Sequence, residues 1–201
     1  MKSRALLGLA VAALAWWWYA RHAPADWAGP AAPDPPQQST VNLPPSWKSG
    51  DYAVTPLARF SARAVVLSRC NYSGGHDGAL APTDFALGWA CMSDAALVNR
   101  VKVSQDMRWF EVAWRGELPV SAAEALRSCG NMHLIPASAA VRGELARIRR
   151  HEVITVTGYL VEVRHPDGWS WRSSLSREDT GAGACEGIWV ESVTRARPPR
   201  T

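Results

Sequence analysis

The sequence lacks the short motifs that mark the commonest enzyme families. It contains no glycine-rich phosphate loop, no dinucleotide-binding fingerprint, no His-Glu-x-x-His pair and no Gly-x-Ser-x-Gly elbow. Cys-x-x-Cys and Cys-x-x-His pairs are also missing, and structural zinc sites usually carry ligands at such close spacing. We therefore expect no metal and no cofactor, and the sequence leans away from an enzyme.

Lysine is scarce as well, occurring only at Lys2, Lys48 and Lys102, so that the net charge of +4 comes almost entirely from arginine. The arginines are dispersed, and their densest groups lie at residues 147–150 and 195–200. A nucleic-acid-binding protein concentrates its positive charge in a patch or stripe. Nucleic acid is therefore not the partner that we expect.

One long apolar run is present, at residues 5–20, and it contains no charged residue. Lys2 and Arg4 precede it, and Trp16, Trp17, Trp18 and Tyr19 end it, where aromatic rings favour the membrane interface. The positive-inside rule predicts a single-pass inner-membrane anchor with a cytoplasmic N-terminus and a periplasmic C-terminal domain. A cleaved signal peptide is the alternative, since the run is short enough for one.

The remaining chain divides by composition. Residues 1–22 form the predicted transmembrane signal-anchor, and the proline-rich residues 23–49 form a predicted extended tether. Residues 50–195 are predicted to be one extracytoplasmic domain, and residues 196–201 a basic tail. An apolar fraction of 47% and a charged fraction of 20% are ordinary for a folded protein.

Strand and helix patterns predict the fold class of that domain. Residues 60–68, 108–115, 152–163, 169–175 and 188–193 have strand character, whereas short helices are expected at residues 82–87, 95–101, 121–130 and 138–149. Phe60, Ala62, Ala64 and Val66 fall on one face of the first strand, and Gly158 indicates a bulge or sharp bend in the strand at 152–163. Ser93 and Asp94, and the capping box that begins at Ser121, indicate two of the helix starts. We expect an α+β chain in which a transmembrane helix precedes a curved antiparallel sheet or partial barrel, resembling an oligonucleotide/oligosaccharide-binding barrel.

Four cysteines lie in the predicted exported domain, an even number that an oxidising compartment favours: Cys70, Cys91, Cys129 and Cys185. Three pairings are open, and chain order favours Cys70 with Cys91 and Cys129 with Cys185. Free buried thiols are the alternative.

Chemistry-bearing residues gather late in the chain. Cys185 and His133 with Glu186 or Asp179 are the candidates for a thiol nucleophile, its base and an acid. Asp179 also begins an Asp-Thr-Gly tripeptide, but no second copy supplies the paired carboxylate of an aspartic protease. A second set of residues predicts either a ligand groove or a hydrogen-bonded loop network: Trp169, Trp171, Arg172, Ser173, Ser174, Arg177, Asp179 and Glu186.

Several segments together resemble a group of uncharacterised bacterial membrane-anchored proteins. The segments that carry the resemblance include Leu-Gly-Trp at 87–89, Met-Ser-Asp at 92–94, Asn-Met-His at 131–133, Gly-Tyr-Leu-Val at 158–161 and Asp-Thr-Gly-Ala-Gly-Ala-Cys-Glu at 179–186. The resemblance implies an address in the bacterial envelope and no mechanism.

The leading hypothesis is a membrane-tethered extracytoplasmic module that binds or assembles with an envelope protein. Two alternatives remain open, namely an envelope hydrolase that acts on peptide or glycan and an extracytoplasmic protein that handles nucleic acid.

Overall fold

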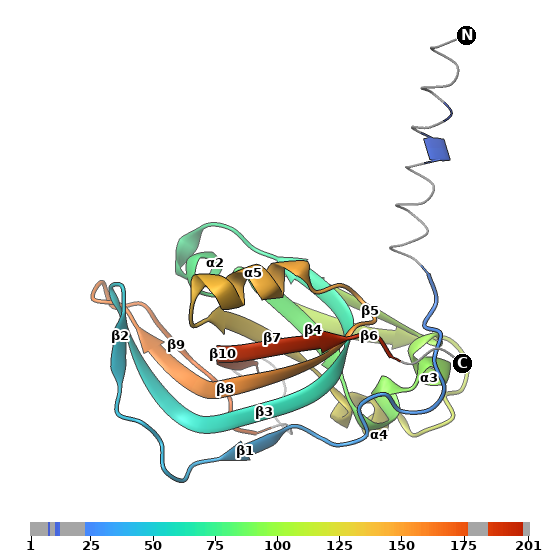
Figure 1. Ribbon diagram of the computed structural model, residues 1–201. Helices are drawn as coiled ribbons and strands as arrows, with labels where there is room; N and C mark the ends of the chain where they lie inside the picture. Colours follow the sequence, from blue (N-terminus) through green and yellow to red (C-terminus); the bar gives the residue numbers. More distant parts are fainter. Residues whose placement is uncertain (1–7, 9–10, 13–22, 177–184, 199–201) are drawn as a thin grey trace.

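The computed structural model of the chain describes residues 8, 11–12, 23–176 and 185–198 (Figure 1). These residues form an eight-stranded sheet and a separate two-stranded sheet. The large sheet consists of β1 (Gln37–Ser39), β2 (Trp47–Ser49), β3 (Tyr52–Asn71), β4 (Thr83–Gly88), β7 (Cys129–Pro136), β8 (Val153–Arg164), β9 (Ser170–Arg172) and β10 (Glu186–Ala196). The small sheet is a hairpin of β5 (Val101–Asp106) and β6 (Trp109–Trp114).

Five strands of the large sheet close into a barrel. Strand β3 pairs with β4, β4 with β7, β7 with β10, β10 with β8, and β8 again with β3. Closure depends on the length of β3, which has 20 residues and pairs with β8 along its first two thirds and with β4 at its end. Closing the sheet in this way removes the exposed edges of these strands.

The barrel interior is apolar and follows the alternation of β3. Phe60, Ala62, Ala64 and Val66 all lie in one buried cluster, which confirms the predicted face. Helix α5 (Ala139–Arg147) packs against this cluster through Leu145, and its N-terminus is capped by Ser138, whose side chain accepts a hydrogen bond from the Val141 amide. Figure 1 shows α5 lying across one side of the barrel strands.

The other helices are short and lie outside the barrel. They are α2 (Gly75–Leu80), the 3₁₀ helix η1 (Ala90–Ser93), α3 (Ala95–Val98) and α4 (Ala122–Arg127). Asp94 caps α3, and Ser121 caps α4 by accepting from the Glu124 amide, as the sequence predicted. Figure 1 shows α3, α4 and the β5–β6 hairpin together at one end of the molecule, where a second apolar cluster lies.

The predicted fold class is wrong in two respects. The domain is mostly sheet rather than α+β, because its described helices have only four to nine residues. The sheet is not purely antiparallel, since β7 and β10 run parallel. Among the described residues, no helix has the length and apolar character needed to cross a membrane. The predicted span at residues 5–20 lies almost entirely outside them.

The helix expected at residues 82–87 is also a strand. All six residues of β4 are buried, because Phe85 and Leu87 face the barrel interior while Ala86 faces the second apolar cluster. A proline followed by an acidic residue favours a helix start, but burial on both sides favours a short central strand. Tertiary packing therefore favours a strand at residues 83–88, although the local sequence favours a helix.

The proline-rich segment expected to be a tether lies against the barrel over much of its length. The Trp27 indole donates to the Ser93 carbonyl at 2.9 Å, and the Asn99 side chain bonds both the amide and the carbonyl of Ala25. Further along, β1 and β2 add to β3, and the Trp47 ring meets the Trp189 ring at 5.4 Å. Residues 25–49 are thus part of the folded structure.

Candidate functional site

A buried cluster of charged side chains joins the β5–β6 hairpin to the barrel. Arg108 Nη1 lies 2.6 Å from Asp84 Oδ1, and His133 Nδ1 lies 2.8 Å from Asp84 Oδ2. Asp84 is on β4, and His133 is its register partner on β7. We call these three residues the anchor cluster. Removing each buried charge from water costs several kcal/mol, so close contact with an opposite charge is needed to offset that cost.

Aromatic rings surround the Arg108 guanidinium. Its central carbon lies 3.9 Å from the centre of the Tyr72 ring and 5.6 Å from that of the Trp171 ring. The Trp171 ring also lies 4.8 Å from the His133 ring. Burial, together with a hydrogen bond to Cys70, raises the pKa of the Tyr72 hydroxyl to about 12. Tyr72 therefore stays neutral and offers its ring face to the arginine.

The backbone at Arg108 is held as firmly as its side chain. The Tyr72 hydroxyl accepts a hydrogen bond from the Arg108 amide at 3.1 Å, and the Asn131 side-chain amide donates to the Arg108 carbonyl at 2.8 Å. Gln105 donates in turn to the Asn131 oxygen at 2.7 Å. The amide of Arg108 is thus bonded to Tyr72 and its carbonyl to Asn131, which Gln105 of β5 holds in turn.

This fixing matters because the turn between β5 and β6 is strained. Asp106 pairs with Trp109, so the turn has two central residues, Met107 and Arg108, with φ of 44° and 71°. A two-residue hairpin turn with positive φ at both positions is the type I′ turn, which favours Asn-Gly. Each non-glycine residue in this region costs on the order of 1–2 kcal/mol. The anchor cluster and the Tyr72 and Asn131 bonds offset that cost.

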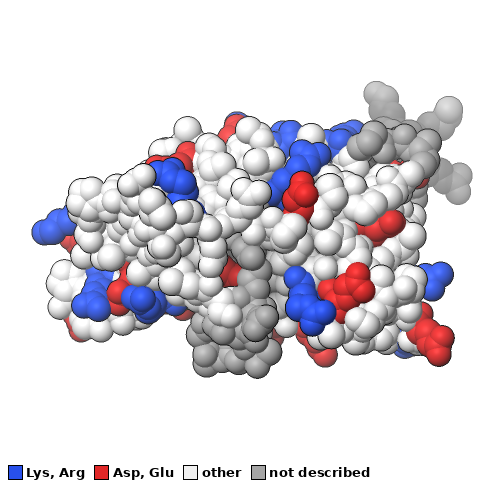
Figure 2. All heavy atoms as spheres, turned by 90° about the horizontal axis from the view of Figure 1, so that it is seen from below, with Lys and Arg blue, Asp and Glu red and all other residues white. Residues whose placement is uncertain are grey.

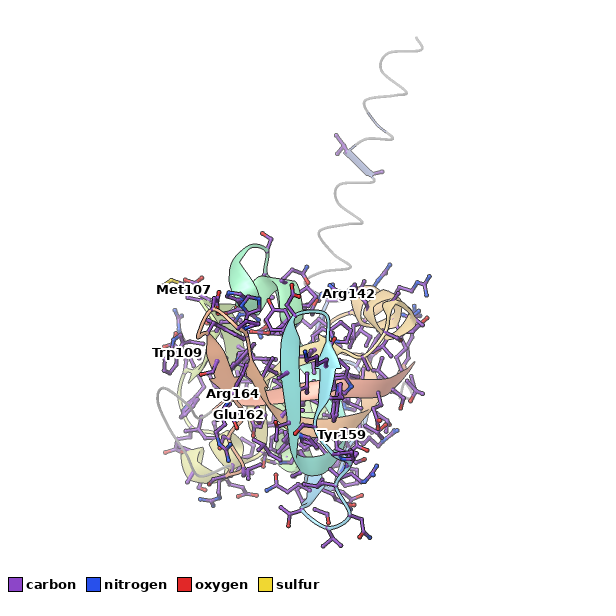
Figure 3. All side chains as sticks on the ribbon, turned by 90° about the vertical axis from the view of Figure 1, so that its left-hand side faces the viewer. Met107, Trp109, Arg142, Tyr159, Glu162 and Arg164 are labelled. Atoms are coloured by element: carbon purple, nitrogen blue, oxygen red, sulfur yellow. The ribbon has the colours of Figure 1, made fainter. Side chains whose placement is uncertain are left out.

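The strained turn presents two apolar side chains to solvent. Met107 is 76% exposed and Trp109 is 52% exposed. Figure 3 shows both at one side of the molecule, pointing away from it, with Arg142 at the opposite side of the view. We call Met107 and Trp109 the hairpin tip. Large apolar side chains gathered at an exposed point typically mark a contact surface.

Unpartnered polar atoms gather next to the turn. Five buried side-chain atoms of the described residues have no aligned hydrogen-bond partner, and four of them belong to this region: Asp84 Oδ2, Gln105 Oε1, Arg108 Nη2 and His133 Nδ1. Asp84 Oδ2 and His133 Nδ1 approach each other closely, but at an angle poor for a hydrogen bond. Buried polar groups usually have partners. These four atoms are therefore an exception, and packing of the hairpin on the barrel does not by itself explain why polar side chains are buried here.

Comparison of the chain with protein-family models, with curated proteins and with solved structures finds no match. The resemblance to membrane-anchored envelope proteins accordingly stays a prediction, and the site is interpreted from its own geometry.

Of the predicted catalytic candidates, His133 belongs to the anchor cluster and is paired with Asp84 rather than with Glu186. Cys185 lies near it, with its sulfur 3.9 Å from the Arg108 carbonyl oxygen. Burial, with the nearby charges of Glu186 and Asp84, raises the pKa of the Cys185 thiol to about 11. Reactive cysteines have a lowered pKa, so this environment disfavours a thiolate nucleophile. Asp179 lies outside the described residues.

The predicted ligand-binding set divides between several places. Trp171 alone among its described members contacts both Arg108 and His133. Arg172 forms a surface ion pair with Glu162, and Trp169 stacks on His76. Arg177 and Asp179 are not described.

The remaining members form the loop network that the sequence left as an alternative. Ser173 donates to the Ser174 carbonyl at 2.8 Å and accepts from the Gly187 amide at 3.1 Å. The Ser174 hydroxyl bonds the backbone of Ser176, and Glu186 is buried at the start of β10. These bonds fix the chain after β9.

The four cysteines all carry free thiols in the structure. Cys91 and Cys129 both contact carbonyl oxygens of α4, at Glu124 and Ala125. Burial and the neighbouring Cys91 raise the pKa of Cys129 to about 12. Cys91 therefore lies beside Cys129, whereas chain order had favoured Cys70 as its partner. Disulfide formation stays a prediction.

Sequence reasoning missed Asp84, Arg108 and Tyr72 as site residues. The sequence around Asp84 predicts the first turn of a helix, whereas Asp84 is fully buried on β4. Arg108 was predicted to be the first residue of the strand at residues 108–115. Only the register of β5 with β6 shows that it occupies a tight turn.

Proposed function

We propose that this protein is a binding module of the bacterial envelope, tethered at the outer face of the inner membrane by residues 5–20. Its hairpin tip, Met107 and Trp109, makes the central contact with an envelope protein. The membrane address rests on the apolar run, on Lys2 and Arg4 before it and on the aromatic residues that end it.

The observation that carries this proposal is the strained turn. A turn built for Asn-Gly instead carries Met107 and Arg108, and a buried ion cluster holds it in place. Backbone strain that the surroundings over-determine is characteristic of functional positions. Here the strain places Met107 and Trp109 at an exposed point, and tryptophan and methionine are enriched in protein interfaces.

A protein partner fits this surface better than nucleic acid does. The tip offers an aromatic ring and a thioether, and the nearest cation, Arg108, is engaged with Asp84. On the face shown in Figure 2, acidic and basic side chains are interspersed rather than gathered into a basic stripe. Nucleic-acid affinity depends on the neutralisation of several phosphates by free basic groups.

The envelope hydrolase is less well supported, because its nucleophile would be Cys185. The raised pKa of that thiol keeps it protonated near neutral pH, and the carboxylate near His133 is already shared with Arg108. Replacement of Cys185 and Glu186 by alanine, one at a time, should leave any envelope phenotype intact wherever the fold is retained.

The direct test is site-specific photo-cross-linking of the full-length protein in its native cells. A photoreactive amino acid at position 107 should give an adduct of discrete mass, and the same probe at the exposed position 142 on α5 should not. Figure 3 shows these two positions on opposite sides of the molecule.

A second arm of the test uses matched apolar truncations. Trp109→Ala should lower the adduct yield strongly, because a central tryptophan commonly contributes about 2 kcal/mol to an interface. Leu126→Ala removes an apolar side chain of α4 with a similar exposed fraction, 48% against 52%, and should leave the yield unchanged. Equal effects of the two variants, or equal adducts from positions 107 and 142, would refute the proposal.

A further inference from the structure

Two histidines and an aspartate meet where α2 lies against the turn between β8 and β9. His76 Nε2 lies 2.8 Å from Asp167 Oδ2, and His165 Nδ1 lies 2.9 Å from Asp167 Oδ1. One ligand-type atom from each of the three residues lies within 4.8 Å of the others. His76 is on α2, and the other two follow β8, so the cluster joins segments about 90 residues apart in the chain.

We infer that His76, His165 and Asp167 form a binding site for a divalent transition metal ion, of which Zn²⁺ is the best fit. Imidazole nitrogens and a carboxylate oxygen are the ligands that Zn²⁺ takes in open sites with three protein ligands. This inference goes beyond the proposed partner binding and does not depend on it.

The groups around the cluster orient its ligands as they do in metal sites. The Tyr52 hydroxyl lies 2.8 Å from His76 Nδ1, so that this nitrogen is engaged and Nε2 faces the centre of the cluster. Histidine ligands usually have the second ring nitrogen fixed in this way. The Trp169 amide donates to Asp167 Oδ1 at 2.9 Å and holds the carboxylate in place.

Aromatic side chains enclose one side of the cluster. The Trp169 ring stacks on the His76 ring at 4.9 Å, and the Tyr52 ring lies 5.0 Å from the His165 ring. The two imidazole rings are themselves 4.4 Å apart. Such a wall limits how far either histidine can turn from the centre, which reduces the ordering that metal binding demands.

The other side of the cluster is open to solvent. The side chains of His76, His165 and Asp167 are 28%, 21% and 50% exposed. A fourth coordination position is therefore accessible to water or to a ligand atom from another molecule, as in sites that exchange or share their metal.

A bound ion would connect α2 to the turn after β8. It would also neutralise the carboxylate that both histidines face. The predicted consequences are one metal ion per chain and a higher melting temperature in the presence of the ion, because a ligand that binds only the folded state stabilises it.

The test is titration of the tag-free full-length protein in detergent with Zn²⁺ by calorimetry, and with Co²⁺ by visible absorption. One equivalent should bind, with a Co²⁺ spectrum typical of tetrahedral or five-coordinate nitrogen and oxygen ligation. His76→Ala, His165→Ala and Asp167→Asn should each abolish stoichiometric binding and the rise in melting temperature. His151→Asn removes a histidine elsewhere and should change neither.

Tyr52→Phe separates a metal site from simple ion pairs between the histidines and Asp167. Loss of the hydroxyl should weaken Zn²⁺ binding by about tenfold while keeping the stoichiometry. Absence of stoichiometric binding in the unaltered protein would overturn the inference. So would binding that survives in His165→Ala, since the ion would then be held by other groups.

Discussion

The Arg108 guanidinium lies 2.6 Å from the carboxylate of Asp84, a residue with no exposed surface, and it reaches that position from the strained turn of a separate hairpin. The pair therefore couples a surface turn to the barrel wall. Because the carboxylate also faces His133, removal of either charge leaves buried groups unsatisfied.

We expect Asp84→Asn and Arg108→Met each to lower the free energy of unfolding by about 3–5 kcal/mol, the usual cost of breaking a buried ion pair. The double variant should be clearly less destabilised than the sum, because neither charge then remains alone. Urea unfolding followed by fluorescence measures both. The matched control is Arg164→Gln, which breaks a surface pair with Glu162 and should cost less than about 1 kcal/mol. Simple additivity of the two buried changes would contradict the pairing.

Local signals predicted several helix starts and the buried face of β3 correctly, although the helix expected at residues 82–87 is a strand. Ser121 and Asp94 cap helices as predicted, and Ser138 caps the helix whose first residue it was expected to be, because capping depends on a few neighbouring residues. The long strand predicted at residues 152–163 also corresponds closely to β8. Patterns that depend only on residues close together in the chain can be recognised in a single sequence.

The pairing of strands that are distant in the chain could not be predicted from the sequence. Closure of the barrel needs β3 to meet both β4 and β8, and no local pattern reports that double pairing. The anchor cluster has the same origin, because Asp84, Arg108 and His133 come from three separate segments that only the closed barrel brings together. Docking of Trp27 likewise depends on Ser93, which is distant in the chain.

Gly158 was predicted to mark a bulge or bend, and the structure gives it a more specific role. A Cβ atom there would lie 1.9 Å from the carbonyl oxygen of Trp189 on β10, and the irregularity itself falls on β10 between Val190 and Ser192. Gly158→Ala should therefore be severely destabilising, by about 3 kcal/mol or more, through forced separation of β8 and β10.

Gly143 provides the matched control for that change. It lies in α5, and a Cβ atom there would meet nothing within 4 Å. Gly143→Ala should stabilise the protein by about 0.5–1 kcal/mol, because alanine restricts the unfolded chain and favours a helix. Thermal unfolding measures the stability of both variants. A mild destabilisation by Gly158→Ala would contradict the expectation and would show that β8 and β10 separate easily.

Stability should fall in mildly acidic solution because of His151. Burial, with the charge of Arg150 adding to it, lowers the pKa of the His151 imidazole to about 4. The unfolded chain takes up this proton near the ordinary pKa of about 6.5, so stability is full above that pH and is lost as pH falls towards 4. Since the ring is part-exposed, we expect a loss on the order of 1–2 kcal/mol.

His151→Asn isolates this contribution, because asparagine tolerates the φ of 69° at that position. The variant should show a flatter dependence of unfolding free energy on pH between about 6.5 and 4 than the unaltered protein. Parallel pH profiles would show that His151 titrates normally in the folded state.

We propose that the anchor cluster holds the hairpin tip in the shape that its partner binds. The most direct measurement combines amide hydrogen exchange with the cross-linking yield from position 107, in the unaltered protein and in Asp84→Asn. We expect exchange at Arg108 and Trp109 to accelerate by about tenfold or more in Asp84→Asn, β8 to stay protected, and the adduct yield to fall. Faster exchange at the turn with an undiminished yield would contradict it.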